Sequence, residues 1–405
     1  MKKSKKKTTW QQNIATLFFL LIGAVCGFLM MMYIDRYLGE DAKTHEVILS
    51  LLGLFVGMYA AIFVHLIIHE AGHLIFGLLS GYRFSSFRIG SFMWVKDNEK
   101  IKFRRLTIAG TGGQCLMSPP DMKDGKIPIV LYNLGGSMIN VIAGALFLGL
   151  FFATQSIPIL STLMLIFAAV GFMIAIMNGV PMRMGTVDND GYNAFALTRN
   201  AEAMRSFWVQ LKANEQVSKG VRLKDMPDEW FAVPTDEAMK NSMVAVMGVF
   251  ACNRLMDAEN FEEADKLMAH MLEIESGITG LHRNLLVCDR MYIELIGENR
   301  KDVLDQMLDK EQKKFMKQMK SFPSVLRTEY VYALLYEKDT EKAAKVKEQF
   351  EKWAKKYPYQ NDVQSERELM ERAEKIAIAT QSLHKETRTL WYVFFCCATI
   401  MASRR

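Results

Sequence analysis

The sequence predicts an α-helical polytopic membrane protein: four transmembrane helices with a small β-hairpin, followed by an all-α soluble domain of helical hairpins. Half of the 405 residues are hydrophobic, and they are concentrated before about position 182, whereas the charged residues are concentrated after it. Four predominantly apolar runs each exceed the roughly 20 residues that a helix needs to cross a bilayer. We therefore expect a transmembrane domain at 1–195, a soluble helical domain at 196–388 and a short apolar tail at 389–405.

The four spans are expected at residues 14–34, 47–80, 129–153 and 157–182. The first follows a lysine-rich amino end. A cleaved signal peptide is the alternative, but the run is long for one and no small-residue cleavage site stands out. We interpret it as a retained span.

The distribution of lysine and arginine orients these spans. The lysine-rich amino end is expected in the cytoplasm, and the loop at 35–46, where acidic residues outnumber basic ones, is expected outside. The loop at 81–128 carries nine cationic residues and is expected inside, as is everything after Met182. The sequence thus predicts a multi-pass protein of the cell membrane with a cytoplasmic amino terminus and a cytoplasmic helical domain.

Two segments of the loop at 81–128 are rich in aromatic and β-branched residues. They are 84–96 and 100–109, on either side of Asp97-Asn98-Glu99. This pattern predicts a β-hairpin at the membrane surface. The glycines at 110–113 would let the chain turn back toward the helices.

An HExxH motif, His69-Glu70-Ala71-Gly72-His73, lies within the second span. Residues four apart share one face of a helix, so two imidazoles can bind one zinc ion while Glu70 stands beside its other ligand positions. An accidental motif, or a histidine pair that only cross-links helices, is the alternative. An unpaired charge at membrane depth costs about 2.5–3.5 kcal/mol on insertion scales, which favours a working site. The motif indicates a metal-dependent hydrolase whose active-site mouth faces the cytoplasm.

A hydrolytic zinc needs three protein ligands and one open position. His65 lies one turn before His69, but three histidines stacked on one straight helix do not easily converge on one ion. Asp188 and Asp190, just past the fourth span, are better placed, although aspartate there is also the usual cap of a helix start. All three residues remain candidates on this reasoning.

The chain resembles the site-2 protease family of intramembrane zinc metallopeptidases over about residues 45–195. Three signatures occur in the family's order: HExxH, then Gly136 followed four residues later by Asn140, then an NxxP element leading to Asp-Gly. The last is Asn178-Gly179-Val180-Pro181 with Asp190-Gly191. The chain departs from the family at Ser137, where proline is common, and in the longer distance from Asn178 to Asp190.

The resemblance implies that zinc is bound by His69, His73 and Asp190. Asp188 fits the family's spacing better, but only Asp190 is followed by glycine, and we favour Asp190. Zinc would activate a water molecule and polarise the scissile carbonyl, and Glu70 would move the proton from that water to the leaving nitrogen.

Two asparagines are given different roles. The family's asparagines help to position the substrate or the developing oxyanion, and Asn178 is the one we expect to do so. Asn140 forms a small-residue stripe with Gly136 and Gly144, which favours close helix packing, and we interpret it as a packing residue.

The region after Tyr192 is polar and helical in pattern. Three segments, at 251–273, 288–308 and 329–353, each pair two helices across a short polar turn. They resemble tetratricopeptide repeats, with a plain helical domain as the alternative. The apolar run at 390–402 is too short to span comfortably; we favour an anchor lying in the membrane interface and keep a fifth span open.

The partners follow from this organisation. We expect a membrane-spanning or signal-peptide-like protein substrate, the lipid bilayer, and a protein partner on the helical domain. No basic stripe with interleaved aromatics is present, so nucleic acid is not expected, and the six scattered cysteines show no CxxC spacing. The alternative function is a membrane-tethered binding or scaffold protein with a vestigial zinc site.

Overall fold

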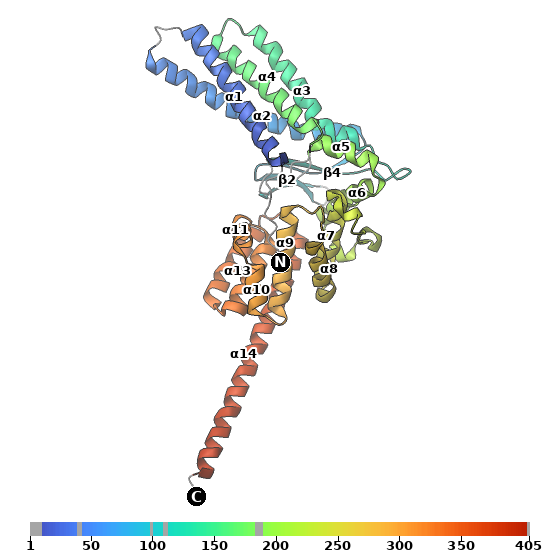
Figure 1. Cartoon of the computed structure of the whole chain (residues 1–405), viewed down its shortest axis with the longest axis vertical. Helices are drawn as coiled ribbons and strands as arrows, with labels where there is room; N and C mark the ends of the chain where they lie inside the picture. The colour runs from blue at the N-terminus through green and yellow to red at the C-terminus, as the bar shows by residue number, and fades with distance from the viewer. Residues whose placement is uncertain (1–9, 39–42, 98–99, 108–111, 183–188, 403–405) are drawn as a thin grey trace. The chain divides into compact units, whose positions relative to one another are not determined.

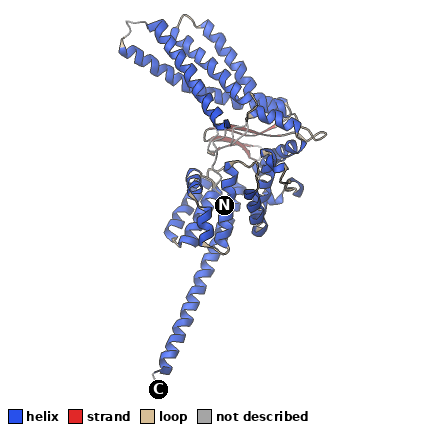
Figure 2. Ribbon diagram, viewed as in Figure 1, coloured by secondary structure: helices blue, strands red, loops and turns tan. Residues whose placement is uncertain are grey.

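The structure, a computed structural model, describes residues 10–38, 43–97, 100–107, 112–182 and 189–402. The described part is mostly helical, with one small sheet (Figures 1 and 2). The chain divides into two compact units. The first comprises Met1–Lys219, Met226–Gly248 and Glu275–Leu281, and the second Gly220–Asp225, Val249–Ile274 and His282–Arg405. The predicted domain boundaries at 195 and 388 stay predictions.

Four helices of the first unit are long and apolar enough to cross a membrane, which confirms the predicted spans. They are α1 (Trp10–Tyr33), α2 (Thr44–Leu79), α3 (Ile129–Ala153) and α4 (Pro158–Gly179). A short π-helix, η1 (Ile34–Leu38), continues α1.

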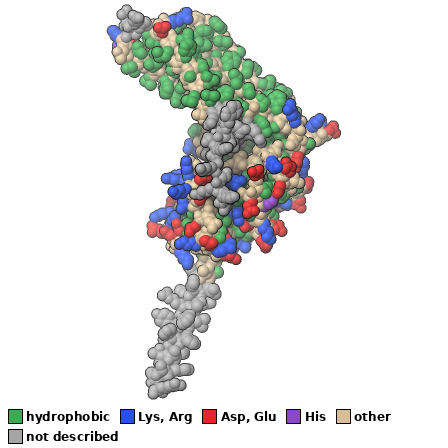
Figure 3. All heavy atoms as spheres, in the orientation of Figure 1, with side chains coloured by type: hydrophobic (Ala, Val, Ile, Leu, Met, Phe, Trp, Pro, Cys, Tyr) green, Lys and Arg blue, Asp and Glu red, His purple; other side chains and the backbone are tan. Residues whose placement is uncertain are grey.

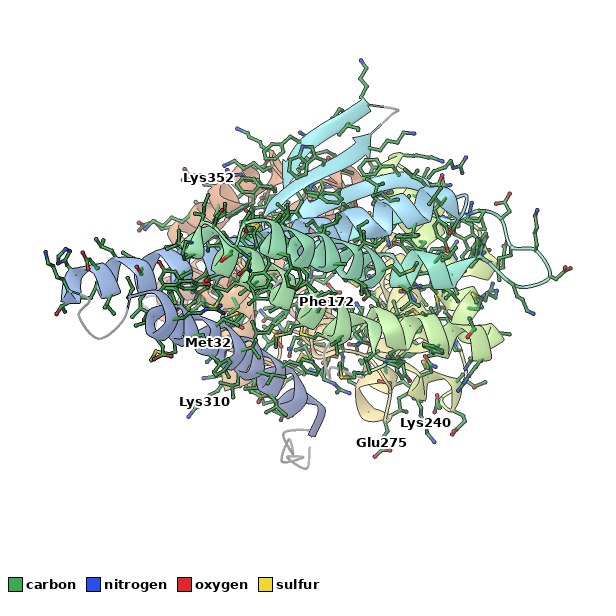
Figure 4. All side chains as sticks on the ribbon, turned by 90° about the horizontal axis from the view of Figure 1, so that it is seen from above. Met32, Phe172, Lys240, Glu275, Lys310 and Lys352 are labelled. Carbon is green, nitrogen blue, oxygen red and sulfur yellow. The ribbon has the colours of Figure 1, made fainter. Side chains whose placement is uncertain are left out.

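Helix α4 is the central helix of this bundle. Half of its apolar window is buried, against 17–24% for the other three, and it contacts all of them. Small residues permit the close packing: a Cβ atom added at Gly144 of α3 would lie 3.2 Å from the ring of Phe172 on α4, which Figure 4 labels. The remaining faces expose large apolar side chains such as Leu49, Phe63 and Phe152, and apolar side chains cover the bundle in Figure 3. Such a surface suits lipid.

The sheet has four antiparallel strands in the order β3-β2-β1-β4. The strands are β1 (Arg83–Ile89), β2 (Phe92–Asp97), β3 (Lys100–Arg105) and β4 (Gly113–Ser118). β2 and β3 pair antiparallel and form the predicted hairpin, but the sheet contains two further strands. The segment 84–96 is not one strand, because Gly90 adopts a φ of +58° and the chain reverses there. The chain also returns to the sheet as β4, which the sequence did not predict.

One face of the sheet is buried and the other is open. Met93 and Val95 of β2 are each 1% exposed, whereas Phe92 and Trp94 between them are 46% and 38% exposed. This alternation is the period of a strand with one face on a core. On the other side of β1, Cys115 and Met117 of β4 join a core with residues of α3 and α6.

Helices α5 (Asp190–Arg199) and α6 (Ala201–Ser218) follow α4. Each begins after an asparagine that caps it: Asn189 accepts a hydrogen bond from the backbone of Tyr192, and Asn200 from that of Ala203. Helix α6 is tied to the chain just after β4, because the indole of Trp208 donates to the backbone oxygen of Pro120 at 3.0 Å. The start of α5 is thus held between the end of α4 and a helix anchored near the sheet.

Short helices form the rest of the chain up to residue 354. They are η2 (Leu223–Asp225), η3 (Asp228–Trp230), η4 (Ala238–Lys240), α7 (Ser242–Asp257), α8 (Phe261–Glu273), α9 (Gly280–Ile296), α10 (Lys301–Met307), α11 (Lys310–Gln318), α12 (Pro323–Val331), η5 (Tyr332–Glu337) and α13 (Thr340–Ala354).

The three predicted helix–turn–helix segments are present. Each turn contains one non-glycine residue in the left-handed region: Glu259 (φ 59°), Asn299 (φ 53°) and Lys338 (φ 56°). The turns therefore share one backbone geometry at a regular interval. The resemblance of these segments to tetratricopeptide repeats stays a prediction.

Buried ion pairs hold the second unit together. The guanidinium of Arg327 on α12 is 1% exposed and donates to Asp289 of α9 and, at 2.7 Å, to Glu366 of α14 (Gln360–Ala402). A buried cation of this kind is tolerated only when it is paired. The predicted apolar segment 390–402 forms the end of the continuous helix α14, and its side chains lie outside the described residues.

Candidate active site

The two histidines of HExxH lie on one face of α2, about two to three turns before its end at Leu79. Their Nε2 atoms are 3.2 Å apart, and His69, Glu70 and His73 are all buried. The α-helical spacing that brings residues i and i+4 together accounts for this placement.

Asp190, the first residue of α5, completes a cluster with these histidines. Its Oδ2 lies 3.0 Å from His69 Nε2 and 3.3 Å from His73 Nε2. Ligand atoms at about 2.0–2.1 Å from a tetrahedral zinc stand about 3.3 Å from one another, so the cluster fits that ion. These are the three residues predicted as ligands. Asp188, the weighed alternative, lies outside the described residues.

A backbone oxygen fixes the orientation of His73. The Nδ1–H of His73 donates to the carbonyl of Tyr132 on α3 at 2.8 Å. The proton therefore sits on Nδ1, and the lone pair of Nε2 is directed at the cluster. This is the outer hydrogen bond that metal-binding histidines ordinarily make. Nothing in the sequence marks it, because any residue carries a carbonyl.

Asn189 positions Asp190. Its Oδ1 accepts from the backbone N–H groups of Met182 and Tyr192, both at 2.9 Å, and its amide donates to the carbonyls of Met177 and Val180. All four hydrogen-bonding positions of one side chain are used. The end of α4 and the start of α5 are thereby joined by a single residue, which the sequence analysis did not single out.

The glycine after Asp190 has a steric reason. A Cβ atom added at Gly191 would lie 2.3 Å from the backbone oxygen of Gly179, closer than real Cβ contacts allow. Glycine therefore lets the first turn of α5 meet the end of α4, which carries Asp190 toward the histidines.

Helices α2 and α3 also approach through glycine. A Cβ at Gly72 would lie 2.3 Å from the backbone oxygen of Gly135, and one at Gly136 would lie 2.5 Å from Cε1 of His69. Gly136, the first residue of the second signature, thus makes room for the ring of His69, one of the three predicted ligands.

The neighbouring histidines favour the ionised form of the Asp190 carboxyl. Burial acts to raise its pKa, but the neighbouring His73 and His69 outweigh burial and hold the pKa well below its usual range. An ionised carboxylate is the form that binds a metal ion.

Glu70 lies against the first residue of β4. A Cβ added at Gly113 would lie 2.5 Å from Glu70 Oε1. Arg88 of β1 is 1% exposed, donates to the carbonyls of Gly90 and Gly113, and acts electrostatically on Glu70. In the sequence, Arg88 is only one of nine cationic residues of the loop predicted to be cytoplasmic.

The remaining candidates lie outside the three-residue cluster. Asn178 donates from its amide to the carbonyl of Ile174 at 3.1 Å, within its own helix, and its role toward substrate stays a prediction. His65 contributes no atom to the cluster and instead contacts Asn140. Asn140 also contacts His69, so packing alone does not describe it.

Comparison with protein families gives one finding. A model of peptidase family M50 matches residues 57–400, a span that contains HExxH, Asn140, Asn178 and Asp190 and continues through the second unit. Comparisons with curated proteins and with solved structures gave no match. The match supports an intramembrane metalloprotease in general, and proteases of this family are generally zinc-dependent. Because the match spans well over half of the sequence and includes each signature, the chain belongs to peptidase family M50, the site-2 protease family.

Proposed function

We propose that this protein is an intramembrane zinc metalloprotease that hydrolyses peptide bonds of membrane-embedded helical substrates near the cytoplasmic face. The observation that carries the proposal is the convergence of His69, His73 and Asp190, with mutual ligand-atom distances of 3.0–3.3 Å, beside the carboxyl group of Glu70.

The three ligands would hold one zinc ion, which supplies polarisation of the scissile carbonyl and activation of water. Glu70 would accept the proton of the attacking water at a carboxylate oxygen and deliver it to the nitrogen of the leaving amine. The carboxyl group of Glu70 is buried, which limits the access of bulk water to it. We assign Asn178 to the substrate carbonyl, since it lies on the last turn of α4, close in sequence to the Asn189 cap that orders this region.

The sheet offers a place for the cleaved segment. A helix resists proteolysis because its backbone is hydrogen-bonded internally, so the substrate must unwind locally. β4 is an outer strand of the sheet, and its first residue touches Glu70. An unwound substrate segment that adds to β4 as a further strand would lie next to the catalytic carboxyl. The sequence led us to expect that an edge of the predicted hairpin would bind the unwound substrate. We now assign this binding to β4, because β4 is the edge strand that lies against Glu70.

The orientation in the membrane follows from charge. The loop at 81–128 and the chain after Met182 carry most of the lysine and arginine of the membrane domain, so both are assigned to the cytoplasm. HExxH lies late in α2, toward that side. The cytoplasmic helical domain would then bind a protein partner or substrate, and the lipid bilayer would surround the membrane helices.

A membrane-tethered scaffold with a vestigial zinc site is the other candidate. It is not favoured, because degeneration would remove ligands or the general base first, and His69, Glu70, His73 and Asp190 are all present.

The test is zinc content and cleavage measured on the same preparations. The full-length protein should contain about one zinc and cleave a model single-span substrate. Glu70→Gln should keep the zinc and lose cleavage by about 10²–10⁴-fold, since only proton transfer is removed. Normal cleavage by Glu70→Gln would contradict the protease mechanism. A wild-type protein that contains no zinc would contradict the proposed metal site.

A further inference from the structure

Two buried polar residues of the membrane bundle have no part in the proposed chemistry. His65 of α2 and Asn140 of α3 are both 0% exposed. Asn140 lies between two rings: its Oδ1 is 3.1 Å from Nδ1 of His65, and its Nδ2 is 3.3 Å from Nδ1 of His69. One side chain thus connects the histidine outside the cluster to a histidine inside it.

The bundle makes specific room for this arrangement. A Cβ added at Gly171 of α4 would lie 2.4 Å from Cε1 of His65, so only glycine accommodates the ring there. The ring of Phe147 packs edge-on against His65, with centroids 5.6 Å apart. Polar groups at membrane depth are costly unless they are paired. Residues of α3 and α4 therefore fix His65 at a position where an apolar residue would be less costly.

The hydrogen-bonding pattern depends on what His69 binds with its other nitrogen. With Nδ2 of Asn140 facing it, Nδ1 of His69 is an acceptor and its proton is on Nε2, which faces Asp190. An ion bound at Nε2 takes the place of that proton, so the proton must then sit on Nδ1. The Nδ1–H of His69 and the Nδ2 of Asn140 are both donors, and they would then face each other unless the amide of Asn140 turns.

A turned amide restores both hydrogen bonds of Asn140. Asn140 Oδ1 then accepts from Nδ1–H of His69, and Nδ2 donates to Nδ1 of His65. The proton of His65 moves to Nε2, which makes no hydrogen bond among the described residues in the first arrangement.

We propose that Asn140 and His65 are positioning residues for the metal site: Asn140 holds the ring and tautomer of His69 for metal binding, and His65 holds Asn140. The proposal rests on the proposed metal site and extends it. The two metal-binding histidines are then oriented by different means. His73 uses the backbone carbonyl of Tyr132, which no substitution removes, whereas His69 uses a side chain that substitution can remove.

Zinc affinity of the full-length protein, measured by competition with a chelator in detergent, tests the proposal. Asn140→Leu keeps the size and removes the acceptor, and should weaken zinc binding about 10–100-fold, the usual effect of losing the hydrogen-bond partner of a metal-binding histidine. Asn140→Asp keeps an acceptor toward His69 Nδ1–H and should bind zinc as tightly as the wild type. His65→Phe should weaken binding less than Asn140→Leu, and the double variant should be no weaker than Asn140→Leu alone.

A matched control is available on the same helix. Asn133 of α3 is buried and donates to the carbonyl of Ile129 of its own helix at 3.0 Å. Asn133→Leu therefore perturbs packing and polarity without touching a metal-binding ring, and its zinc affinity should equal that of the wild type.

The outcomes separate the two proposals. If His73→Ala binds zinc as tightly as the wild type, the proposed metal site is wrong. If His73→Ala loses zinc but Asn140→Leu binds zinc as tightly as Asn133→Leu, the metal site stands and only the positioning role is overturned. Equal losses in Asn140→Asp and Asn140→Leu, or full additivity of the His65 and Asn140 effects, would also overturn it. If Asn140→Leu does not fold, Asn140→Asp and His65→Phe carry the test.

Discussion

Gly136 of α3 leaves the space that the imidazole ring of His69 on α2 occupies, since a Cβ there would lie 2.5–2.6 Å from three atoms of the ring. Gly136→Ala should therefore displace the ring and weaken zinc binding. The protein should lose about 1–3 kcal/mol of stability, as overpacking a buried site does. Zinc content and thermal unfolding of the purified variant measure the two effects. Gly149→Ala is the control, because a Cβ at Gly149 on the same helix meets nothing within 4 Å. Equal behaviour of the two variants would contradict the steric explanation.

Asp190→Ala should lower zinc occupancy sharply, because it removes the only carboxylate of the described ligand cluster. Metal analysis of the purified protein measures the change. Asp188→Ala and His65→Ala should each lower occupancy less. Should metal loss follow Asp188 instead, the ligand assignment is wrong.

Asn189→Ala should release the loop that carries Asp190, because it removes hydrogen bonds to the backbone of Met177, Val180, Met182 and Tyr192. Unsatisfied buried backbone groups cost about 1–3 kcal/mol each. We expect both a lower melting temperature and weaker zinc binding. Asn200→Ala removes a cap from α6 and should lower stability by about 1 kcal/mol without affecting zinc. Zinc binding by Asn189→Ala at the wild-type level would show that Asp190 is held by other contacts.

Cysteines engineered in the loop at 35–46 should react with an impermeant thiol reagent applied to intact cells, and cysteines in the turn at 257–260 should react only after the cells are opened. The physical reason is the excess of cationic residues on the assigned cytoplasmic side. The unmodified chain gives the background, and its described cysteines, Cys26, Cys115, Cys252 and Cys288, are all buried. Labelling of the turn from outside would reverse the proposed orientation.

The stability of the second unit should fall as pH rises toward neutrality. Burial raises the pKa of Asp362 to about 7, and the charges of Glu366 and Asp257 add to the shift while Arg222 opposes it. The folded pKa exceeds the unfolded value of about 3.9, so this contribution is complete below pH 3.9 and is lost as pH rises to about 7. Hydrogen exchange in the first turns of α14 measures it.

Asp362→Asn keeps the side chain neutral and should remove this part of the pH dependence. Glu368 provides the contrast: burial acts to raise its pKa, but hydrogen bonds from Arg222 and Gln364 outweigh burial and lower it. Glu368→Gln should therefore leave the fall in protection between about pH 4 and about pH 7 in place. A wild-type profile that is flat in this interval would contradict the assignment to Asp362.

The elements that could be predicted from the sequence are those with a strong local pattern. The four spans follow from apolar runs. The three residues of the cluster follow from HExxH and Asp190-Gly191, because helical spacing alone places His69 beside His73. The turns near Glu259, Asn299 and Lys338 were marked by polar residues between apolar helices.

The contacts that could not be predicted join elements far apart in the chain. The second hydrogen bond of His73 is made by a backbone oxygen, and Arg88 resembles any loop cation until the sheet buries it. β4 has little strand pattern of its own; Gly113–Ser118 becomes a strand because it pairs with β1. Asn140 carried a packing pattern, and only the fold shows the two rings on either side of it.

The distance along the chain between His69 and Asp190 has a consequence for biosynthesis. The two residues are 121 positions apart, and α3, α4 and the Asn189 cap must all be in place before they meet. A ribosome that has completed only α2 has made both histidines and the general base, but not the third ligand. A nascent polypeptide that ends after α2 therefore lacks one of the three proposed ligands. The proposed zinc site can therefore form only after α3, α4 and the start of α5 have been made.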